Sequence, residues 1–260
     1  MKQFDVKTLK QLYLPKKDSH KGENGKLLVI GGSKLFHSAS MWALEVASRV
    51  VDMVFYSSVP VNEAIVRKQK ERFQNGIIVP KGKLDEYVQE ADCILIGPGM
   101  ERSKETKEKT NYLLKKFKTK RWVIDGGALQ MMDKKLLNKN MIITPHHQEY
   151  KLLFGQEKIE TVAKKYNCTI ALKGREDVIC DGKECLINKT GNEGMTKGGT
   201  GDVLAGLIAA LYCKNKAFLA ASCGTYLNGL AGDRLYVLVG SYFNASDLVR
   251  ELPTVMGEVL

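Results

Sequence analysis

A glycine-rich run that ends in one acidic residue has the clearest chemical potential in this sequence. Residues 198–202 read Gly-Gly-Thr-Gly-Asp, and an apolar stretch typical of a buried helix follows as far as Tyr212. Glycine lets a ligand approach the main chain closely. If a helix begins near Asp202, the loop amides and the helix dipole point at one place, where they would hold an anionic phosphoryl group. Lys173 and Lys197 would add positive charge.

Asp202 itself has two interpretations. Aspartate is among the best helix N-caps, and the motif alone favours that structural role. A carboxylate beside an anion-binding loop is also placed to act as a general base, taking the proton from a hydroxyl that attacks a phosphoryl group. The loop is not a Walker motif, in which the second glycine is followed by lysine, because Gly199, five residues after Gly194, is followed by Thr200. It is not a Rossmann fingerprint either, because no G-x-G-x-x-G opens the first helix.

Seven short apolar runs alternate with helical patterns before this loop. Each run ends in Gly, Pro or Ser, as is typical of strands buried on both faces of a parallel sheet. This alternation predicts a doubly wound α/β fold with right-handed crossovers and helices on both faces. The predicted strands begin at Lys26, Asp52, Gly76, Asp92, Arg121, Met141 and Thr169, and the predicted helices between them cover residues 38–51, 62–73, 104–117 and 149–155.

The pattern changes after Gly174. Two short runs at residues 178–182 and 184–189 predict an antiparallel hairpin at the edge of the mainly parallel sheet. Helices are then expected around residues 202–212, 217–237 and 247–260. Because no linker, repeat or low-complexity segment interrupts the chain, we predict a single domain over residues 1–260.

The composition narrows the classes of partner. The chain has 260 residues, a net charge of +11 and a pI near 9.2, which favours anionic partners. The basic residues are scattered without interleaved aromatics, so nucleic acid is not the expected ligand. No apolar segment reaches the ~18 residues of a membrane span and none resembles a signal peptide, so a cytoplasmic location away from membranes is expected. The six cysteines form no C-x-x-C pair, which predicts buried reduced thiols and no zinc site.

Glycine and polar residues gather where the predicted strands end. Open α/β sheets bind ligands at that edge, so five such strand ends together indicate a ligand cleft. The five segments are Gly31-Gly32-Ser33, Gly97-Pro98-Gly99, Asp125-Gly126-Gly127, Thr144-Pro145-His146 and Lys173-Gly174. No role follows from the sequence for His37, and Trp42 is expected in the core or at an interface.

Taken together, these segments resemble the ADP/ATP-dependent NAD(P)H-hydrate dehydratase family, which has a ribokinase-like fold. The Gly-Gly-Thr-Gly-Asp run is shared with several ribokinase-like kinases, whereas the HKG, TPH and TGN elements are more specific. The matching segments are HKGENGKLLVIGGS (20–33), GPGM (97–100), VIDGGAL (123–129), ITPHHQE (143–149), ALKG (171–174), TGNEGMTKGGTGDVLAGLIAAL (190–211) and YLNGLAGD (226–233).

The resemblance implies a hydro-lyase that repairs NADH and NADPH whose nicotinamide ring has been hydrated. In that family ADP or ATP, with Mg²⁺, phosphorylates the ring hydroxyl, and elimination of phosphate restores the double bond. The family pattern starts within the first ~25 residues, too short a lead for the epimerase domain that many relatives carry, so a stand-alone dehydratase is expected. The resemblance also implies a homo-oligomer, often a tetramer, with residues 225–233 and the flanking helix as a candidate contact.

The resemblance assigns site residues by position. The hydrated dinucleotide is expected to contact Ala39, Gly99, His146 and Asp202, of which Asp202 matches the base that acts on the ring hydroxyl. The adenine nucleotide is expected at Lys173, Gly174, Arg175, Glu176, Asp177 and Gly201. The anion-binding amides correspond to Gly198, Gly199, Thr200 and Gly201. Asn192 and Glu149 match polar residues near the phosphate and Mg²⁺.

The sequence also departs from the family pattern. Four segments differ: His147-Gln148 replaces Pro-Gly, Arg175-Glu176-Asp177 replaces small residues and Thr, Asp125-Gly126-Gly127 replaces Asp-Ala-Asp, and Glu193 replaces Pro. The second of these bears on nucleotide preference. Two other functions remain open at this point: a small-molecule kinase on the same scaffold, of the hydroxymethylpyrimidine or hydroxyethylthiazole type, and a non-catalytic module that binds nucleotides or RNA.

Overall fold

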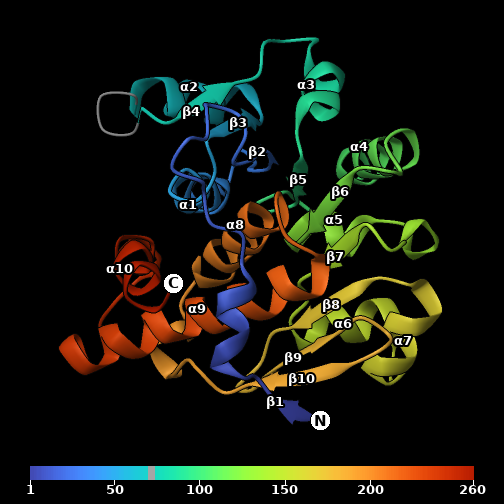
Figure 1. The fold of residues 1–260 in the computed structure, drawn as a ribbon. Helices are drawn as coiled ribbons and strands as arrows, with labels where there is room; N and C mark the ends of the chain where they lie inside the picture. Colours follow the sequence, from blue (N-terminus) through green and yellow to red (C-terminus); the bar gives the residue numbers. More distant parts are fainter. Residues whose placement is uncertain (70–73) are drawn as a thin grey trace.

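A ten-stranded sheet runs through the molecule in the computed structural model, which describes residues 1–69 and 74–260 (Figure 1). The strand order is β1-β10-β9-β8-β7-β6-β5-β2-β3-β4. The strands are β1 (Lys2–Gln3), β2 (Lys26–Ile30), β3 (Met53–Ser57), β4 (Gly76–Ile78), β5 (Cys93–Ile96), β6 (Arg121–Ile124), β7 (Met141–Ile143), β8 (Thr169–Leu172), β9 (Asp177–Cys180) and β10 (Cys185–Asn188).

The pairing confirms the predicted doubly wound, mainly parallel architecture. All neighbouring strands from β4 to β8 are parallel, whereas β9 is antiparallel to both β8 and β10. The hairpin after Gly174 therefore lies where the sequence placed it, and the two-residue β1 adds parallel to β10 at the edge. The seven predicted parallel strands are all present.

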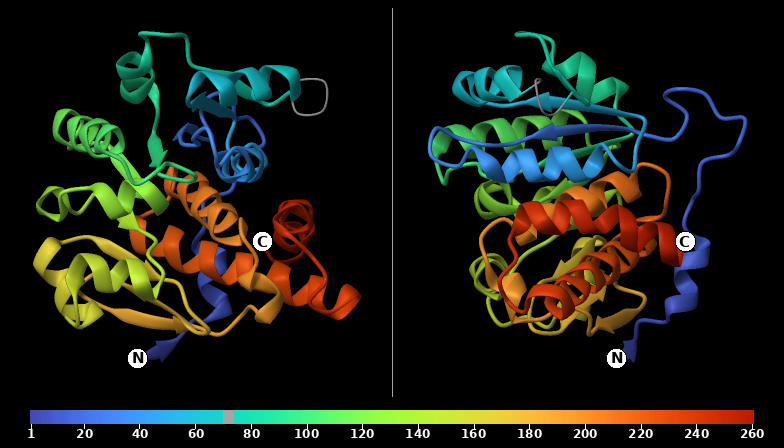
Figure 2. Two further views of the ribbon diagram at one scale, coloured as in Figure 1. Left: turned by 180° about the vertical axis from the view of Figure 1, so that it is seen from behind. Right: turned by 90° about the vertical axis from the view of Figure 1, so that its left-hand side faces the viewer.

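Helices cover both faces of the sheet because alternate strand side chains point to opposite sides. In β2, Leu27 and Val29 belong to one buried core, and Leu28 and Ile30 to the other. Figures 1 and 2 show α1, α8, α9 and α10 on one side and α4, α5, α6 and α7 on the other. The helices are α1 (Ser38–Ala47), α2 (Pro60–Gln69), α3 (Leu84–Glu90), α4 (Lys104–Lys116), α5 (Gly126–Met131), α6 (His147–Phe154), α7 (Ile159–Tyr166), α8 (Thr200–Tyr212), α9 (Ala217–Val239) and α10 (Ala245–Val259), with 3₁₀ turns at Val6–Gln11, Lys134–Leu136 and Glu193–Thr196.

Helix boundaries differ from the predictions mainly at the ends. Helix α1 stops at Ala47, and α6 begins at His147 because His146 caps it. The short helices α3, α5 and α7 were not predicted, since six to eight residues carry little periodic signal. The last part of the predicted helix at 62–73 lies outside the described residues. In the described ranges, no helix combines the length and apolar character that crossing a membrane requires.

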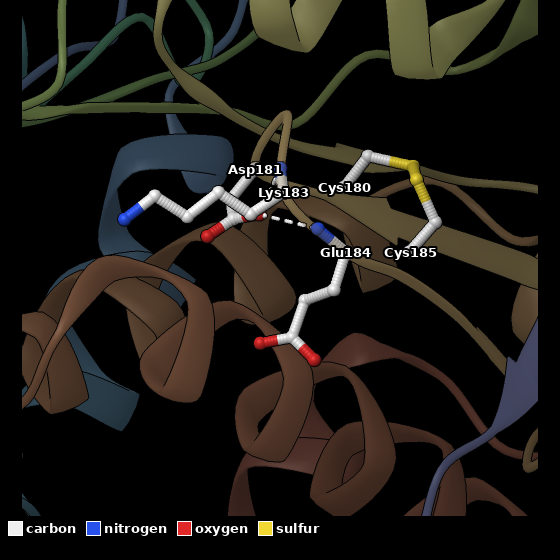
Figure 3. Close-up of a disulfide and its surroundings, with 5 residues drawn as sticks. All are labelled: Cys180, Asp181, Lys183, Glu184 and Cys185. Atoms are coloured by element: carbon white, nitrogen blue, oxygen red, sulfur yellow. Dashed lines mark hydrogen bonds between the residues drawn. A yellow bond between two sulfur atoms is a disulfide. The ribbon is translucent and has the colours of Figure 1, made fainter.

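A disulfide joins Cys180 to Cys185, so the prediction that all six cysteines are reduced is wrong (Figure 3). The two residues are direct partners in the β9–β10 register, and their Cα atoms lie 4.3 Å apart. The connecting turn is closed by the Asp181 amide, which donates to the Glu184 carbonyl oxygen at 3.2 Å. The other four, Cys93, Cys168, Cys213 and Cys223, are buried free thiols, as predicted.

The segment predicted as a subunit contact is largely internal. Residues 225–233 lie in α9, and most of them are buried against the protein's own core. The exposed apolar side chains come later, at the end of α9 and in the following loop: Tyr236, Val237, Leu238, Val239 and Tyr242. Within α9, these exposed apolar side chains belong to the last turn, which is part of the flanking helix that was predicted together with residues 225–233.

The disulfide predicts a thiol count and a stability change. The unfolded, unreduced chain should titrate with four thiols and the reduced chain with six. Cys185→Ser should lower the free energy of unfolding by about 2 kcal/mol, because the bond closes a loop of only a few residues in the unfolded chain. Thiol titration and denaturant unfolding measure both quantities, and a reductant should not destabilise the variant further. Six reactive thiols before reduction would contradict the bond.

Candidate active site

The glycine run forms the start of α8. Gly199 is the residue before the helix, with a φ of +100°, and a β-carbon there would lie 2.4 Å from the Trp42 ring. Only glycine suits both the left-handed backbone and the close aromatic contact. The Thr200 hydroxyl donates to the carbonyl oxygens of Met195 (2.7 Å) and Lys197 (3.0 Å), which fixes the incoming loop.

Asp202 is not the N-cap, so the structural interpretation that the motif favoured is wrong. It is the third residue of α8, a half-buried position in the first helical turn. The cap position is taken by Gly199, whose backbone makes the turn into the helix. The helix beyond is apolar on all sides and nearly every residue from Val203 to Tyr212 is buried, as predicted. Asp202 thus lies on a buried helix, and its side chain is not needed to cap that helix.

Two cavities lie on either side of this helix start. The first, here named the hairpin-side cavity, has a volume of about 830 Å³ and is lined by residues 173–177, 189–193 and the helix residues Thr200 and Gly201. The second, named the α1-side cavity, has a volume of about 800 Å³ and is lined by residues 35–39 together with Trp42, Gly99, Gly198, Gly199 and Asp202. Each is large enough for a small-molecule ligand.

Most of the predicted site residues divide between the two cavities. The six residues predicted for the nucleotide, Lys173, Gly174, Arg175, Glu176, Asp177 and Gly201, all line the hairpin-side cavity. Of those predicted for the dinucleotide, Ala39, Gly99 and Asp202 line the α1-side cavity. The loop amides are shared: Gly198 and Gly199 face the α1 side, and Thr200 and Gly201 face the hairpin side. The α8 start is therefore the common wall of the two cavities.

A buried ion pair lies beneath this wall. The Lys173 Nζ atom is 2.8 Å from Asp125 Oδ1, which also accepts a hydrogen bond from the Thr144 hydroxyl at 2.8 Å. These three residues follow β8, β6 and β7 and meet at the carboxyl edge of the sheet. Burial opposes the charge on Lys173, but the carboxylates of Asp125 and Glu149 outweigh it and raise the pKa of this lysine. Lys173 therefore stays a cation beside Gly201.

The environment of Asp202 weakens its acidity. Burial raises the pKa of this carboxyl to about 7, and the negative charges of Asp125 and Glu149 add to the effect while Lys173 opposes it. A carboxyl with a pKa near neutrality is well matched to general base catalysis, because it accepts a proton readily and is still partly ionised at pH 7.

His146 and Glu149 form the cap of α6. The His146 Nδ1 atom accepts from the amides of Gln148 (3.1 Å) and Glu149 (3.3 Å), and Glu149 Oε2 accepts from the His146 amide at 2.9 Å. Glu149 Oε1 accepts from Gln130 Nε2 at 2.7 Å. His146 pairs with Lys173 in a β-bridge, but within the described residues it does not line the α1-side cavity.

The residues expected near Mg²⁺ are not brought together as a cage. Asn192 lines the hairpin-side cavity, where its Oδ1 accepts from the Gly194 amide and its Nδ2 donates to Asp233, both at 3.0 Å. Glu149 Oε2 is engaged in the α6 cap, and Glu149 Oε1 accepts a hydrogen bond from Gln130. Across residues 1–69 and 74–260, no group of three or more His, Cys, Asp or Glu side chains could hold a metal.

Some residues of the site were not recognised in the sequence. His37, Trp42 and Gln130 line the α1-side cavity without having been assigned to it. Only their positions in the sequence could have indicated this. His37 and Trp42 come soon after β2 ends, and Gln130 comes soon after β6 ends. Lys197, expected to add charge to the loop, instead donates to the Ser241 carbonyl oxygen and does not line either cavity in the described chain.

Comparison with known proteins gives a consistent result. Residues 27–254 match the family model described as NAD(P)H-hydrate dehydratase. The bifunctional NAD(P)H-hydrate repair enzyme Nnr of Methanocaldococcus jannaschii is 39% identical over 95% of this chain. The ADP-dependent (S)-NAD(P)H-hydrate dehydratase of Cenarchaeum symbiosum is 34% identical over 93% of this chain and 91% of that protein. The chain spans about half the length of the bifunctional relatives, 51% in the case of the M. jannaschii enzyme.

Solved structures share the fold. A ribokinase-like superfamily protein from Enterococcus faecalis superposes with a TM-score of 0.89 at 24% identity, over 99% of this chain and 96% of that chain. An ADP/ATP-dependent NAD(P)H-hydrate dehydratase from Bacillus subtilis, co-crystallised with ATP/Mg²⁺, gives a TM-score of 0.83 at 23% identity, over 100% and 99% of the two chains. These likenesses confirm the predicted ribokinase-like fold.

The raised pKa of Asp202 predicts a pH-dependent stability. Between about pH 4 and 7 the folded protein holds a proton on Asp202 that the unfolded chain releases, so stability is lost as the pH rises through this window. Asp202→Asn should therefore raise the melting temperature, and more at pH 8 than at pH 5. Thermal unfolding at both pH values measures this, with the exposed Asp18→Asn as a matched control. An equal or opposite effect at pH 8 would contradict the raised pKa.

Proposed function

Because the chain belongs to the NAD(P)H-hydrate dehydratase family, we propose that it catalyses the nucleotide-dependent dehydration of hydrated NADH or NADPH. The observation that carries the proposal is the placement of Asp202 and the α8 amides between two cavities. An adenine nucleotide, ADP or ATP, occupies the hairpin-side cavity, and the hydrated nicotinamide ring occupies the α1-side cavity. The terminal phosphoryl group of the nucleotide then meets the ring hydroxyl at the helix start.

The first chemical step uses Asp202 as the base. Its carboxylate takes the proton of the ring hydroxyl, the hydroxyl oxygen bonds to the terminal phosphorus, and the bond from phosphorus to the leaving nucleotide breaks. The amides of residues 198–201 and the helix dipole stabilise the negative charge of the transferred group. Lys173, held as a cation by Asp125, adds to this stabilisation from beneath.

The second step removes the phosphate. The lone pair of the ring nitrogen expels the phosphate by breaking the bond between C6 and oxygen, and loss of a proton from C5 gives the C5=C6 double bond. Phosphorylation makes the hydroxyl a far better leaving group, which explains why a nucleotide is consumed. The net products are NADH or NADPH, phosphate and the shortened nucleotide.

Magnesium fits this site as a companion of the nucleotide. Mg²⁺ in phosphoryl-transfer sites is held by one or two protein oxygens, with phosphates and waters supplying the rest, so the lack of a protein-only cage in the described chain is no obstacle. Asn192 is the better placed of the two expected residues, because in the described chain it lines the hairpin-side cavity and Glu149 does not. When bound, the ion neutralises charge on the phosphoryl oxygens.

We also propose that the chain forms a homo-oligomer. The support for self-association is the group of exposed apolar side chains at the end of α9, Val237 at 85% and Leu238 at 72% exposure. Large exposed apolar side chains that lie together mark contact surfaces.

The direct test is a spectrophotometric assay of hydrated NADH with ADP and ATP in turn. The wild type should restore NADH absorbance and release phosphate, whereas a kinase would accumulate a stable phosphorylated product. Asp202→Asn should lower kcat by about 10²–10⁴-fold, because it removes the general base. Circular dichroism verifies its folding, and Asp18→Asn serves as the charge-matched control. A folded Asp202→Asn protein with near-normal kcat would exclude the base role.

The same base predicts the acidic side of the pH profile. Because Asp202 must be ionised to act, kcat/KM should fall about tenfold per pH unit below roughly pH 7, whereas an ordinary aspartate would stay active to about pH 5. Asp125→Asn removes a neighbouring negative charge and should shift this limb to lower pH. Measuring kcat/KM from pH 5 to 9 decides the point, since an unshifted limb in Asp125→Asn would show that another group titrates.

A further inference from the structure

His37 lines the same α1-side cavity as Asp202, and the proposed first step leaves it without a role. The residue precedes α1, but its side chain makes no capping hydrogen bond to the helix. It is half-buried and lies two residues before Ala39, which packs near Gly99. A β-carbon on Gly99 would be 2.8 Å from the Phe36 carbonyl oxygen and 3.0 Å from Ala39. The loop that carries His37 is thus held in place beside the α1-side cavity.

A chain of hydrogen bonds determines which ring nitrogen of His37 carries the proton. The chain ends at the carbonyl oxygen of Gly31, which only accepts, so the Ser58 hydroxyl at 2.5 Å must donate to it. The Ser58 oxygen then accepts from Asn62 Nδ2 at 3.0 Å, which directs Asn62 Oδ1 towards the His37 ring. Asn62 Oδ1 lies 2.5 Å from His37 Nδ1, and an amide oxygen only accepts. The neutral ring therefore carries its proton on Nδ1.

This tautomer leaves Nε2 as the ring nitrogen with a free lone pair. Asn62 is only 1% exposed, so the partner that orients the ring is rigidly enclosed. Gly32 makes room for it: with a φ of +78° and no side chain, Gly32 avoids a β-carbon that would lie 2.1 Å from Asn62 Nδ2. An imidazole oriented through Nδ1 by a fixed acceptor is the arrangement in which histidine acts as a base through Nε2.

We propose that His37 is a second catalytic residue, which takes the C5 proton in the elimination step; this inference rests on the proposed function. After the bond from C6 to the phosphate oxygen breaks, C6 and the ring nitrogen are joined as a C6=N iminium. The C5–H bond then breaks, its electron pair forms the C5=C6 bond, the C6=N π pair returns to the nitrogen, and the proton moves to Nε2. In the resulting imidazolium, Nδ1–H still donates a hydrogen bond to Asn62 Oδ1, whose partial negative charge stabilises the cation. Asp202 and His37 thus divide the two proton transfers, one from oxygen and one from carbon.

Without a base at C5, the intermediate formed by loss of phosphate faces a different fate. Water adds back at C6 and regenerates the hydrated ring, so the nucleotide is consumed without forming NADH. The ratio of nucleotide consumed to NADH formed therefore reports on His37 separately from binding and from phosphoryl transfer. A purely structural role for the bond between His37 and Asn62 would not change that ratio.

The experiment compares wild type, His37→Ala, His37→Gln and the matched control His20→Ala, a histidine whose side chain is 87% exposed. Hydrated NADH and the better nucleotide are supplied, and NADH and nucleotide are quantified together. Both His37 variants should form NADH about 10²–10⁴-fold more slowly, with the nucleotide-to-NADH ratio rising above the wild-type value of about one. Added imidazole should restore NADH formation in His37→Ala, and deuterium at C5 should slow that variant more than the wild type.

The outcomes separate the two proposals. Equal losses of NADH formation and nucleotide consumption in a folded His37→Ala protein, with an unchanged ratio and no imidazole rescue, would overturn the role of His37. Normal rates in both His37 variants would do the same. Failure of the wild type itself to convert hydrated NADH would instead reject the proposed function. Asp202→Asn provides the contrast, because it should lower nucleotide consumption and NADH formation together.

Discussion

The position of the first turn of α8 is the constraint on which the rest of the site depends. Gly206 packs so closely on α1 that a β-carbon there would lie 2.7 Å from the Ala43 backbone, and Gly199 packs as closely on Trp42. These contacts lock α8 to α1, the helix that follows His37 and carries Ala39. Close packing of this kind resists small displacements. The position of the helix start relative to the two cavities beside it is therefore fixed by the packing of α8 on α1.

The charge arrangement beneath this turn follows from the sheet. Parallel strands bring Asp125, Thr144 and Lys173 to one edge, where a cation and carboxylates share a poorly solvated space. The same negative charges that keep Lys173 protonated make Asp202 a weaker acid. The raised pKa of Lys173 and the raised pKa of Asp202 thus have one electrostatic origin. As a consequence, ionisation of Asp202 lowers the stability of the folded protein relative to the unfolded chain.

Local patterns explain why much of this was predictable from sequence. The apolar runs defined the parallel strands, and the residues after each strand end, such as Asp125 and Lys173, had to meet at one edge. The role of Asp202 as a cap was mispredicted because Gly199, in a left-handed conformation, makes the turn three residues earlier than a cap at Asp202 would. Features that depend on distant partners gave no local signal. Asn62, for example, orients His37 across 25 residues. The disulfide is a different case, because Cys180 and Cys185 are only five residues apart on the predicted hairpin and the register of that hairpin pairs them directly.

The wall between the cavities also has a consequence for how such a protein diverges. The departures at Arg175, Glu176 and Asp177 lie on the hairpin side, while Ala39, Gly99 and the Asn62 chain belong to the other side. Substitutions on one side need not disturb the other, because the shared residues are mostly backbone amides that side-chain changes leave in place. Descendants of one ancestor could thus acquire a different ligand in the hairpin-side cavity while the α1-side cavity stays unchanged.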